Sequence, residues 1–283
     1  MSARPRSLVL VGGTGTEVGK TWVAAAVAGQ LREEGWVISA RKPAQSFDPH
    51  DDAPHDSEVL GEATNESPDA VCPPHRNYEV AMAPPMAATS LGRPSFTTSD
   101  LVDEVTGSWP PHSVDVGIVE LAGGWRSPQA APDAAGDDCR AFASLLAPDL
   151  VVLVADAGLG TLNSVRSARD SVDQPAVVVL NRFDPLDPLH GANRDWLVEV
   201  DGTEVFTSSG ALVGLIASGL GGYCTGCGRR APECSGCLPE LEAPRCCQRC
   251  GRRLTVVVTP TSVHASCRLH GDGTVRRSGR SPR

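Results

Sequence analysis

A short apolar run that ends in a glycine-rich turn constrains this chain more than any other feature. Residues 7–11 read SLVLV and residues 12–21 read GGTGTEVGKT, directly before an apolar-periodic segment that begins at Trp22. Backbone N–H groups in such a turn, together with the N-terminus of a following helix, form an anion site. Lys20 is then placed to reach the outer phosphates of a nucleotide, and the Thr21 hydroxyl to bind Mg²⁺. The loop is one residue longer than the ordinary G-x-x-x-x-G-K-[ST] pattern, because Thr14 stands where that pattern needs its first glycine.

The use of lysine points to the same place. The chain has 25 basic residues, of which only Lys20 and Lys42 are lysines. Lys42 follows the apolar run 36–40, which we interpret as the second strand. Both ammonium groups are therefore expected at the ends of neighbouring strands, the edge of an open α/β sheet where ligands bind.

Apolar runs alternate with helical periodicity along the first 180 residues. This alternation predicts an α/β fold of the nucleotide-binding P-loop type: a mostly parallel sheet with helices on both faces. Expected strands are 7–11, 36–40, 116–119, 150–155 and 176–180; expected helices are 22–34, 98–106, 162–173 and, in short form, 82–91; 48–56 and 71–85 are expected loops.

Charge and cysteine divide the chain into two modules. The formal net charge is −9, yet residues 221–283 hold 11 arginines against 4 acidic residues, a net +7, and 8 of the 10 cysteines lie between positions 224 and 267. We expect a P-loop domain at 1–218, a small Cys-rich metal-binding module at 219–272 and a disordered basic tail at 273–283. No run of about 18 apolar residues is present and the N-terminus does not resemble a signal peptide, so we expect a cytoplasmic protein that does not enter a membrane.

Polar side chains follow other predicted strands. Glu120 ends the run 116–119 before two glycines, Asp56 closes an acidic loop, and Asn181 ends the run 176–180. The two carboxylates are candidate Mg²⁺ ligands and the amide is a candidate reader of a nucleobase edge. The alternatives are a strand-end acid at Glu120, a helix N-cap at Asp56 and an ordinary turn at Asn181.

Taken together and in this order, these motifs resemble those of dethiobiotin synthetases, over roughly residues 7–218. The resemblance includes the phosphate loop lengthened by one residue. It rests on residues 13–21, residues 42–46, Asp56, residues 120–124, residues 160–163 and Asn181.

The resemblance implies an ATP- and Mg-dependent cyclo-ligase that joins CO₂ to 7,8-diaminononanoate and works as a homodimer. Its implied catalytic residues are Thr16, Lys20 and Lys42, and its implied Mg²⁺ ligands are Thr21, Asp56 and Glu120. The implied ATP-binding residues are Gly13, Thr14, Gly15, Thr16, Glu17, Val18, Gly19, Lys20, Thr21 and Asn181. The implied substrate-binding residues are Lys42, Ser46, Gly123, Gly160, Thr161, Leu162 and Asn163, the last four across a dimer interface.

Three features depart from that family. Leu121 and Phe47 stand at positions where the family usually has glycine, and we expect both to add bulk near the reacting groups. The segment after Asn181 is short, ending near Leu215, which predicts a more open adenine side.

The Cys-rich module contains four pairs of potential metal ligands. Cys-x₂-Cys and Cys-x₂-His spacing lets both side chains of a pair reach one ion, so eight ligands suit two tetrahedral zinc sites, and thiolates suit an iron–sulfur cluster equally well. The pairs are Cys224 with Cys227, Cys234 with Cys237, Cys247 with Cys250, and Cys267 with His270. Cys246 stands outside these pairs, and Cys72 and Cys139 are expected to be plain core or loop residues.

The tail also resembles, over about 50 residues, a small auxiliary protein of biotin synthase, which implies support of that radical enzyme as a partner. The resemblance rests on residues 223–228, 241–245, 247–254, 256–260 and 267–271, although Cys234 stands where histidine is expected. The rival interpretation of the whole chain is a non-catalytic or regulatory P-loop ATPase whose zinc ribbon docks a partner or nucleic acid. Nucleic acid is disfavoured, because Tyr223 is the only aromatic residue of the tail that could stack on a base.

Overall fold

The computed structural model describes residues 4–220, 223–229, 234, 237, 242–247, 251–259 and 262–268, and the backbone of 271–275. The chain forms two compact units, Met1–Ile216 and Ala217–Arg283, which are considered separately. This division lies two residues before the boundary that the composition predicts at 218. No helix of the described residues combines the length and the apolar character that crossing a membrane requires.

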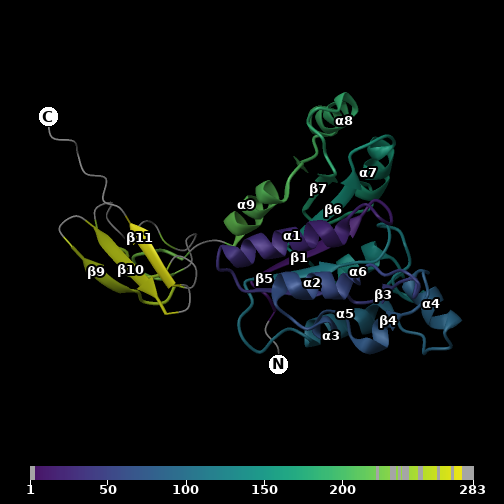
Figure 1. Ribbon diagram of the computed structural model, residues 1–283, viewed down its shortest axis with the longest axis horizontal. Helices are drawn as coiled ribbons and strands as arrows, with labels where there is room; N and C mark the ends of the chain where they lie inside the picture. Colours follow the sequence, from purple (N-terminus) through teal and green to yellow (C-terminus); the bar gives the residue numbers. More distant parts are fainter. Residues whose placement is uncertain are drawn as a thin grey trace. The chain divides into compact units, whose positions relative to one another are not determined.

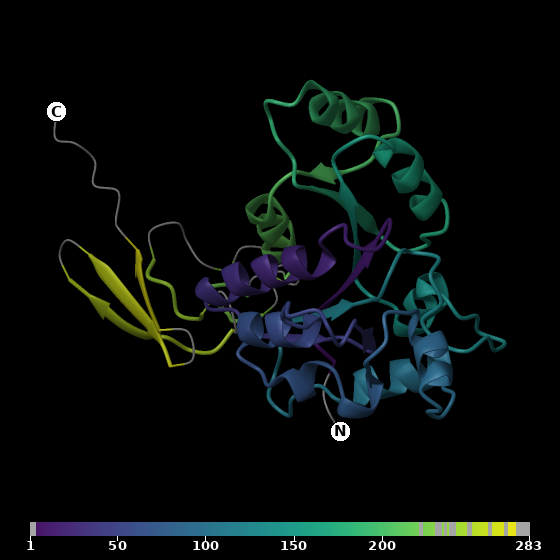
Figure 2. The same cartoon turned by 45° about the vertical axis from the view of Figure 1, so that its right-hand side comes forward.

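A parallel sheet forms the centre of the first unit (Figures 1 and 2). In the described part of the chain it has six strands in the order β2-β5-β1-β6-β7-β8, and every pair is parallel. The strands are β1 (Ser7–Gly13), β2 (Ile38–Arg41), β5 (Val116–Glu120), β6 (Leu150–Asp156), β7 (Ala176–Asn181) and β8 (Val205–Phe206). Five of the six strands coincide with the predicted apolar runs, and the fold class is confirmed. Because all run the same way, their carboxyl ends share one edge.

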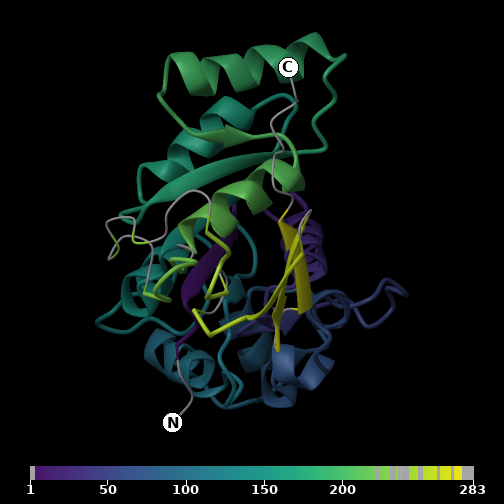
Figure 3. The same ribbon diagram turned by 90° about the vertical axis from the view of Figure 1, so that its left-hand side faces the viewer.

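Both faces of this sheet are buried, and helices cover them from two sides (Figure 3). Alternate residues of β1 separate the faces: Leu8 and Leu10 belong to the main core cluster together with Phe142 of α6 (Cys139–Leu146), whereas Val9 and Val11 are buried outside that cluster. Strands buried on both faces have no polar side to alternate with, which is why they read as continuous apolar runs.

The helices are α1 (Lys20–Glu33), α2 (Asp56–Thr64), α3 (Pro68–Val71), α4 (Pro84–Ser90), α5 (Thr98–Gly107), α6 (Cys139–Leu146), α7 (Thr161–Arg169), α8 (Pro188–Glu199) and α9 (Ser209–Gly219). Four of these helices, α1, α4, α5 and α7, lie near predicted positions, although α7 ends at Arg169 and not at 173; the other five were not predicted. The expected loop at 71–85 contains the 3-10 turn η1 (Pro74–Arg76) and β4 (Asn77–Tyr78), which pairs with β3 (Gln45–Ser46). This small pair of strands holds the segment after Lys42 in place.

The second unit contains an antiparallel sheet of β9 (Thr255–Val258), β10 (Val263–Cys267) and β11 (Gly271–Val275). Its register pairs Ala265 with Val256 on one side and with Gly273 on the other. The sheet extends past residue 272, so the predicted basic tail begins inside β11. Residues 276–283 lie outside the described part of the chain.

Candidate functional site

The glycine-rich loop lies where β1 ends and α1 begins, at the carboxyl edge of the sheet. Gly19 caps α1 with φ 88°, in the left-handed region, and a Cβ built on it would lie 2.0 Å from Asn181 Nδ2. Only glycine avoids both the strain and this clash. Lys20 is buried, and its ammonium donates back to the Gly15 carbonyl at 3.0 Å, across the concave side of the loop.

Four side chains meet beside this loop: Thr21 of α1, Asp56 of α2, Glu120 of β5, and Lys42, the residue that follows β2. The Thr21 hydroxyl lies 2.7 Å from Asp56 Oδ1 and 2.9 Å from Glu120 Oε1, so it can donate its single proton to either carboxylate. The Lys42 ammonium lies 2.6 Å from both Asp56 Oδ2 and Glu120 Oε1. Lys42 is 2% exposed and Glu120 is fully buried, so this pair is shielded from bulk water, whereas the Asp56 side chain is 40% exposed.

The pKa directions follow from that burial. Burial favours the neutral form of the Lys42 ammonium, but the carboxylates of Asp56 and Glu120 outweigh it and raise its pKa. Burial raises the pKa of Glu120, against the opposing effect of Lys42. For Lys20, burial and the repulsion from Lys42 lower the pKa. The two lysines therefore differ: Lys42 has two anionic partners, whereas Lys20 is a desolvated cation suited to an incoming anion.

Oxygen ligands for a divalent cation converge at this point. Thr21 supplies a hydroxyl within hydrogen-bond distance of the Asp56 and Glu120 carboxylates, and Glu120 Oε2 is buried with no hydrogen-bond partner. A buried carboxylate oxygen is costly to leave unpaired. Mg²⁺ takes one or two carboxylates together with phosphate oxygens and water, so these residues fit the predicted ion.

A hollow of about 930 Å³ opens above this network. Of the predicted site residues, the structure brings together Thr16, Glu17, Gly19, Lys20, Thr21, Lys42, Ser46, Asp56, Glu120 and Gly123 along its walls. Sequence reasoning missed Trp22 and Arg182, which also line it. The position of Trp22 directly after the Gly-Lys-Thr motif is the signal that could have identified it.

Asn181 lines a second hollow of about 460 Å³ instead. Its Nδ2 donates to the Val18 carbonyl at 3.0 Å and so ties the end of β7 to the phosphate loop. An amide whose nitrogen is used in this way can still accept a hydrogen bond through its oxygen. Its role as a base reader stays a prediction.

The predicted carboxylate-binding residues Gly160, Thr161, Leu162 and Asn163 lie apart from both hollows. They form the N-terminus of α7, after β6, and line neither cavity. The family resemblance implies that these residues bind the substrate carboxylate in the site of a second copy of the chain. This role stays a prediction.

Leu121 and Phe47, the two residues larger than the glycine usual in the family, do not line the hollow, contrary to our expectation. Leu121 is 1% exposed and belongs to the core cluster, because its backbone continues the line of β5 and directs the side chain into the sheet packing. Phe47 stacks on His55, with ring centroids 3.8 Å apart. Neither lines the cavity above Lys42.

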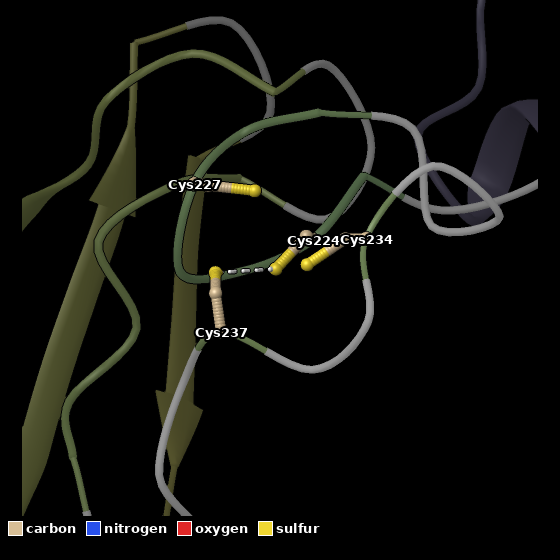
Figure 4. A group of neighbouring side chains, drawn as sticks. All are labelled: Cys224, Cys227, Cys234 and Cys237. Carbon is tan, nitrogen blue, oxygen red and sulfur yellow. Dashed lines mark hydrogen bonds between the residues drawn. The ribbon is translucent and has the colours of Figure 1, made fainter.

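In the second unit, four cysteines form a compact cluster (Figure 4). The Sγ atoms of Cys224, Cys227, Cys234 and Cys237 all lie within 4.8 Å of one another, and those of Cys224 and Cys237 are 3.4 Å apart. The Gly226 N–H lies 3.3 Å from the Cys224 sulfur. Sulfur ligands at about 2.3 Å from a tetrahedral zinc ion are separated by roughly 3.8 Å, so this cluster could hold one metal ion.

Two turns of this unit share one backbone design. In each, a cysteine N–H donates to the carbonyl five residues later (2.7 Å at Cys224, 2.8 Å at Cys247), and the glycine four residues later donates back to the cysteine carbonyl (2.9 and 2.8 Å). These glycines, Gly228 and Gly251, have φ of 73° and 69°, and a Cβ on either would lie 2.5–2.6 Å from the carbonyl oxygen of the other. The two turns therefore pack directly against each other. Cys247 and Cys267 are buried, whereas their predicted co-ligands Cys250 and His270 lie outside the described residues.

Comparison with known proteins identifies relatives of the first unit. Residues 7–207 match the family model described as AAA domain. The chain is 34% identical over 218 residues to the ATP-dependent dethiobiotin synthetase BioD of Rhodococcus jostii, covering 75% of this chain and 90% of that protein. It is 31% identical over 226 residues to the protein of the same name from Haloferax mediterranei, covering 75% and 88%. Among solved structures, the signal recognition particle receptor FtsY of Elizabethkingia anophelis has a TM-score of 0.46 and 14% identity, covering 77% of this chain and 66% of that chain.

Proposed function

Because the chain belongs to the family of ATP-dependent dethiobiotin synthetases, we propose that it catalyses ATP-dependent ring closure of 7,8-diaminononanoate with CO₂. The observation that carries the proposal is the buried network in which Lys42 contacts both Asp56 and Glu120 beside the phosphate loop. A simple nucleotide-binding module needs Lys20 and Thr21, but it has no use for a second buried ammonium at the end of the neighbouring strand.

The reaction consists of three bond-forming steps. One substrate amine adds to CO₂ and loses a proton, which gives a carbamate. A carbamate oxygen then attacks the γ-phosphorus of ATP, the bond to the β-phosphate oxygen breaks, and ADP leaves. The second amine attacks the carbonyl carbon of the resulting mixed anhydride, phosphate departs, the attacking nitrogen loses a proton, and the ureido ring closes. In the middle step negative charge moves between oxygens, so the protein acts mainly by positioning and by neutralising charge.

The residues divide these tasks by their position. Lys20 contacts the β- and γ-phosphates, and Lys42 lies between the carbamate oxygen and the γ-phosphate, where it stabilises charge on both. Thr16 and Ser46, on the wall of the hollow, contact the diamine or the carbamate. Thr21, Asp56 and Glu120 would hold Mg²⁺, which neutralises phosphate charge when bound. The N-terminus of α7 binds the substrate carboxylate across a homodimer interface, and the enzyme acts in the cytoplasm.

Dependence on both substrates tests the proposal. Purified protein should release ADP from ATP only when diaminononanoate and bicarbonate are both present, and the product should be dethiobiotin. Lys20→Ala should abolish turnover and leave the fold intact, because the lysine contributes charge to the anion site rather than to the core. ADP release that is independent of the diamine would support the rival regulatory ATPase, and undiminished product formation by Lys20→Ala would overturn the role of the loop.

For the second unit, we propose that Cys224, Cys227, Cys234 and Cys237 bind a single metal ion. The carrying observation is the mutual distance of their sulfurs, at most 4.8 Å. A four-iron cluster places a cube of iron and sulfide between its cysteines and needs them further apart, so zinc fits this arrangement better than an iron–sulfur cluster. Support of biotin synthase by this unit is a further proposal, which rests on the sequence resemblance of the tail.

Metal analysis of anaerobically purified protein, with an absorption spectrum, tests the metal proposal. We expect zinc without visible absorption, lost in the double variant Cys224→Ser with Cys237→Ser and retained in the control Cys246→Ser. Cys246 is a buried cysteine of the same unit outside the cluster. Metal loss should increase protease cleavage after residue 220, because so small a core needs a metal to fold. Broad visible absorption with bound iron would contradict zinc, and full metal content in the double variant would contradict the ligand set.

A further inference from the structure

The two hollows of the first unit meet along a shared border. The larger one contains Lys20 and Thr21, and the smaller one contains Asn181. Three residues line both: Gly19, Trp22 and Arg182. A nucleotide whose phosphates bind at Lys20 and whose base reaches toward Asn181 spans both hollows. Its sugar, and the part of the base next to the sugar, then lie at this border.

Arg182 forms one side of the border and is held in place. Its guanidinium donates to the Glu17 carbonyl at 3.0 Å and pairs with Asp156 at 3.2 Å. Both Arg182 and Glu17 have positive φ, 56° and 61°, which non-glycine residues rarely adopt. The contact between these two strained residues fixes Arg182 to the phosphate loop, so it does not close over a ligand by itself.

Trp22 also lines the border and is open to solvent. It is the third residue of α1, and at 62% it is the most exposed of the five tryptophans of the chain. The residues that follow it, Val23 and Ala24, are buried and anchor the helix. The first turn of α1 therefore holds a large indole surface at the border, and this indole contributes little to the core.

We propose that Trp22 is a positioning residue that packs against the nucleoside part of ATP and makes binding depend on the base and sugar as well as on the phosphates. Stacking of a base on an aromatic side chain contributes about 1–3 kcal/mol. The smaller hollow is also lined by the end of β7 and by residues 207–209, and Trp22 contributes an exposed aromatic surface to it from α1. The inference rests on the proposed function, because it requires ATP as the ligand.

The test compares ATP with inorganic tripolyphosphate, which has the phosphate chain without the nucleoside. Binding of each, with Mg²⁺, is measured by calorimetry for the wild type, Trp22→Ala, Trp22→Phe and the control Trp196→Ala. Trp196 is also an exposed tryptophan, at 47%, and lines neither hollow. We expect Trp22→Ala to weaken ATP binding about 5- to 150-fold, the equivalent of about 1–3 kcal/mol, and to leave tripolyphosphate binding unchanged.

Two further readouts separate packing from loss of structure. Trp22→Phe should retain most of the ATP affinity, because phenylalanine keeps an aromatic face. ATP should change the tryptophan fluorescence of the wild type and of Trp196→Ala but not that of Trp22→Phe. Equal ATP affinity in Trp22→Ala and the wild type, or an equal loss for ATP and tripolyphosphate, would overturn the inference. If the wild type binds ATP in the expected pattern but makes no dethiobiotin, the proposed reaction fails while the role of Trp22 stands.

Discussion

Replacing Lys42 by glutamine should affect stability as well as turnover, and this separates it from Lys20. Lys42 is the buried cation between Asp56 and Glu120, so Lys42→Gln leaves two carboxylates facing each other without a positive partner. Breaking a buried ion pair by removing one partner costs about 3–5 kcal/mol. The Asp56 side chain is 40% exposed, so water screens its interaction with Lys42. We therefore take the lower end of this range, about 3 kcal/mol, as the expected loss of stability.

Denaturant and thermal unfolding measure this effect. A loss of about 3 kcal/mol lowers the melting temperature of a domain of this size by roughly 6–12 °C. Lys20→Gln is the matched control: the pKa of Lys20 is lowered by burial and by repulsion from Lys42, so removing its charge should leave stability unchanged or slightly higher. Turnover should fall on the order of 10²-fold or more in Lys42→Gln while ATP still binds, the scale seen when one charge-stabilising donor is removed.

The double variant Lys42→Gln with Glu120→Gln identifies the cause. It removes the unpaired buried charge, so most of the lost stability should return, while activity stays low because the ammonium is still absent. An unchanged unfolding midpoint in Lys42→Gln would refute the assignment of the network as a buried ion pair. Equal destabilisation by Lys20→Gln would refute the proposed difference between the two lysines.

Two other predictions follow from the same site and from its surroundings. Gly19→Ala should abolish ATP binding, measured by calorimetry, since its φ of 88° and the contact with Asn181 leave no room for a methyl group, and retained affinity would contradict this geometry. Burial raises the pKa of the Cys72 and Cys139 thiols to about 12, so both should resist alkylation at pH 8 in the native protein, checked by mass spectrometry. Modification of Cys72 or Cys139 in the native protein would contradict the burial argument.

Local patterns in the sequence predicted five of the six strands of the central sheet and the helices α1, α4, α5 and α7, but not α2, α3, α6, α8, α9 or the short strands β3, β4 and β8. Strands such as β1 and β7 are buried on both faces and therefore appear as continuous apolar runs, and the glycine-rich turn before Lys20 fixes where α1 begins. The parallel direction of the strands then places Lys20, Lys42 and Glu120 at one edge. In the tail, cysteine spacing predicted which residues could bind metal, but not how the pairs combine.

The tertiary structure decided where individual side chains point and which of them share a cavity. Leu121 and Phe47 differ from the family in sequence, yet the packing of β5 and the stacking on His55 keep both away from the hollow. Trp22 appeared to be an ordinary helix residue, and only the folded chain shows that it lines two neighbouring cavities together with Gly19 and Arg182. Periodicity reports which face of an element is buried, because burial repeats along the chain, whereas a contact such as that of Arg182 with Glu17 depends on how the whole sheet is assembled.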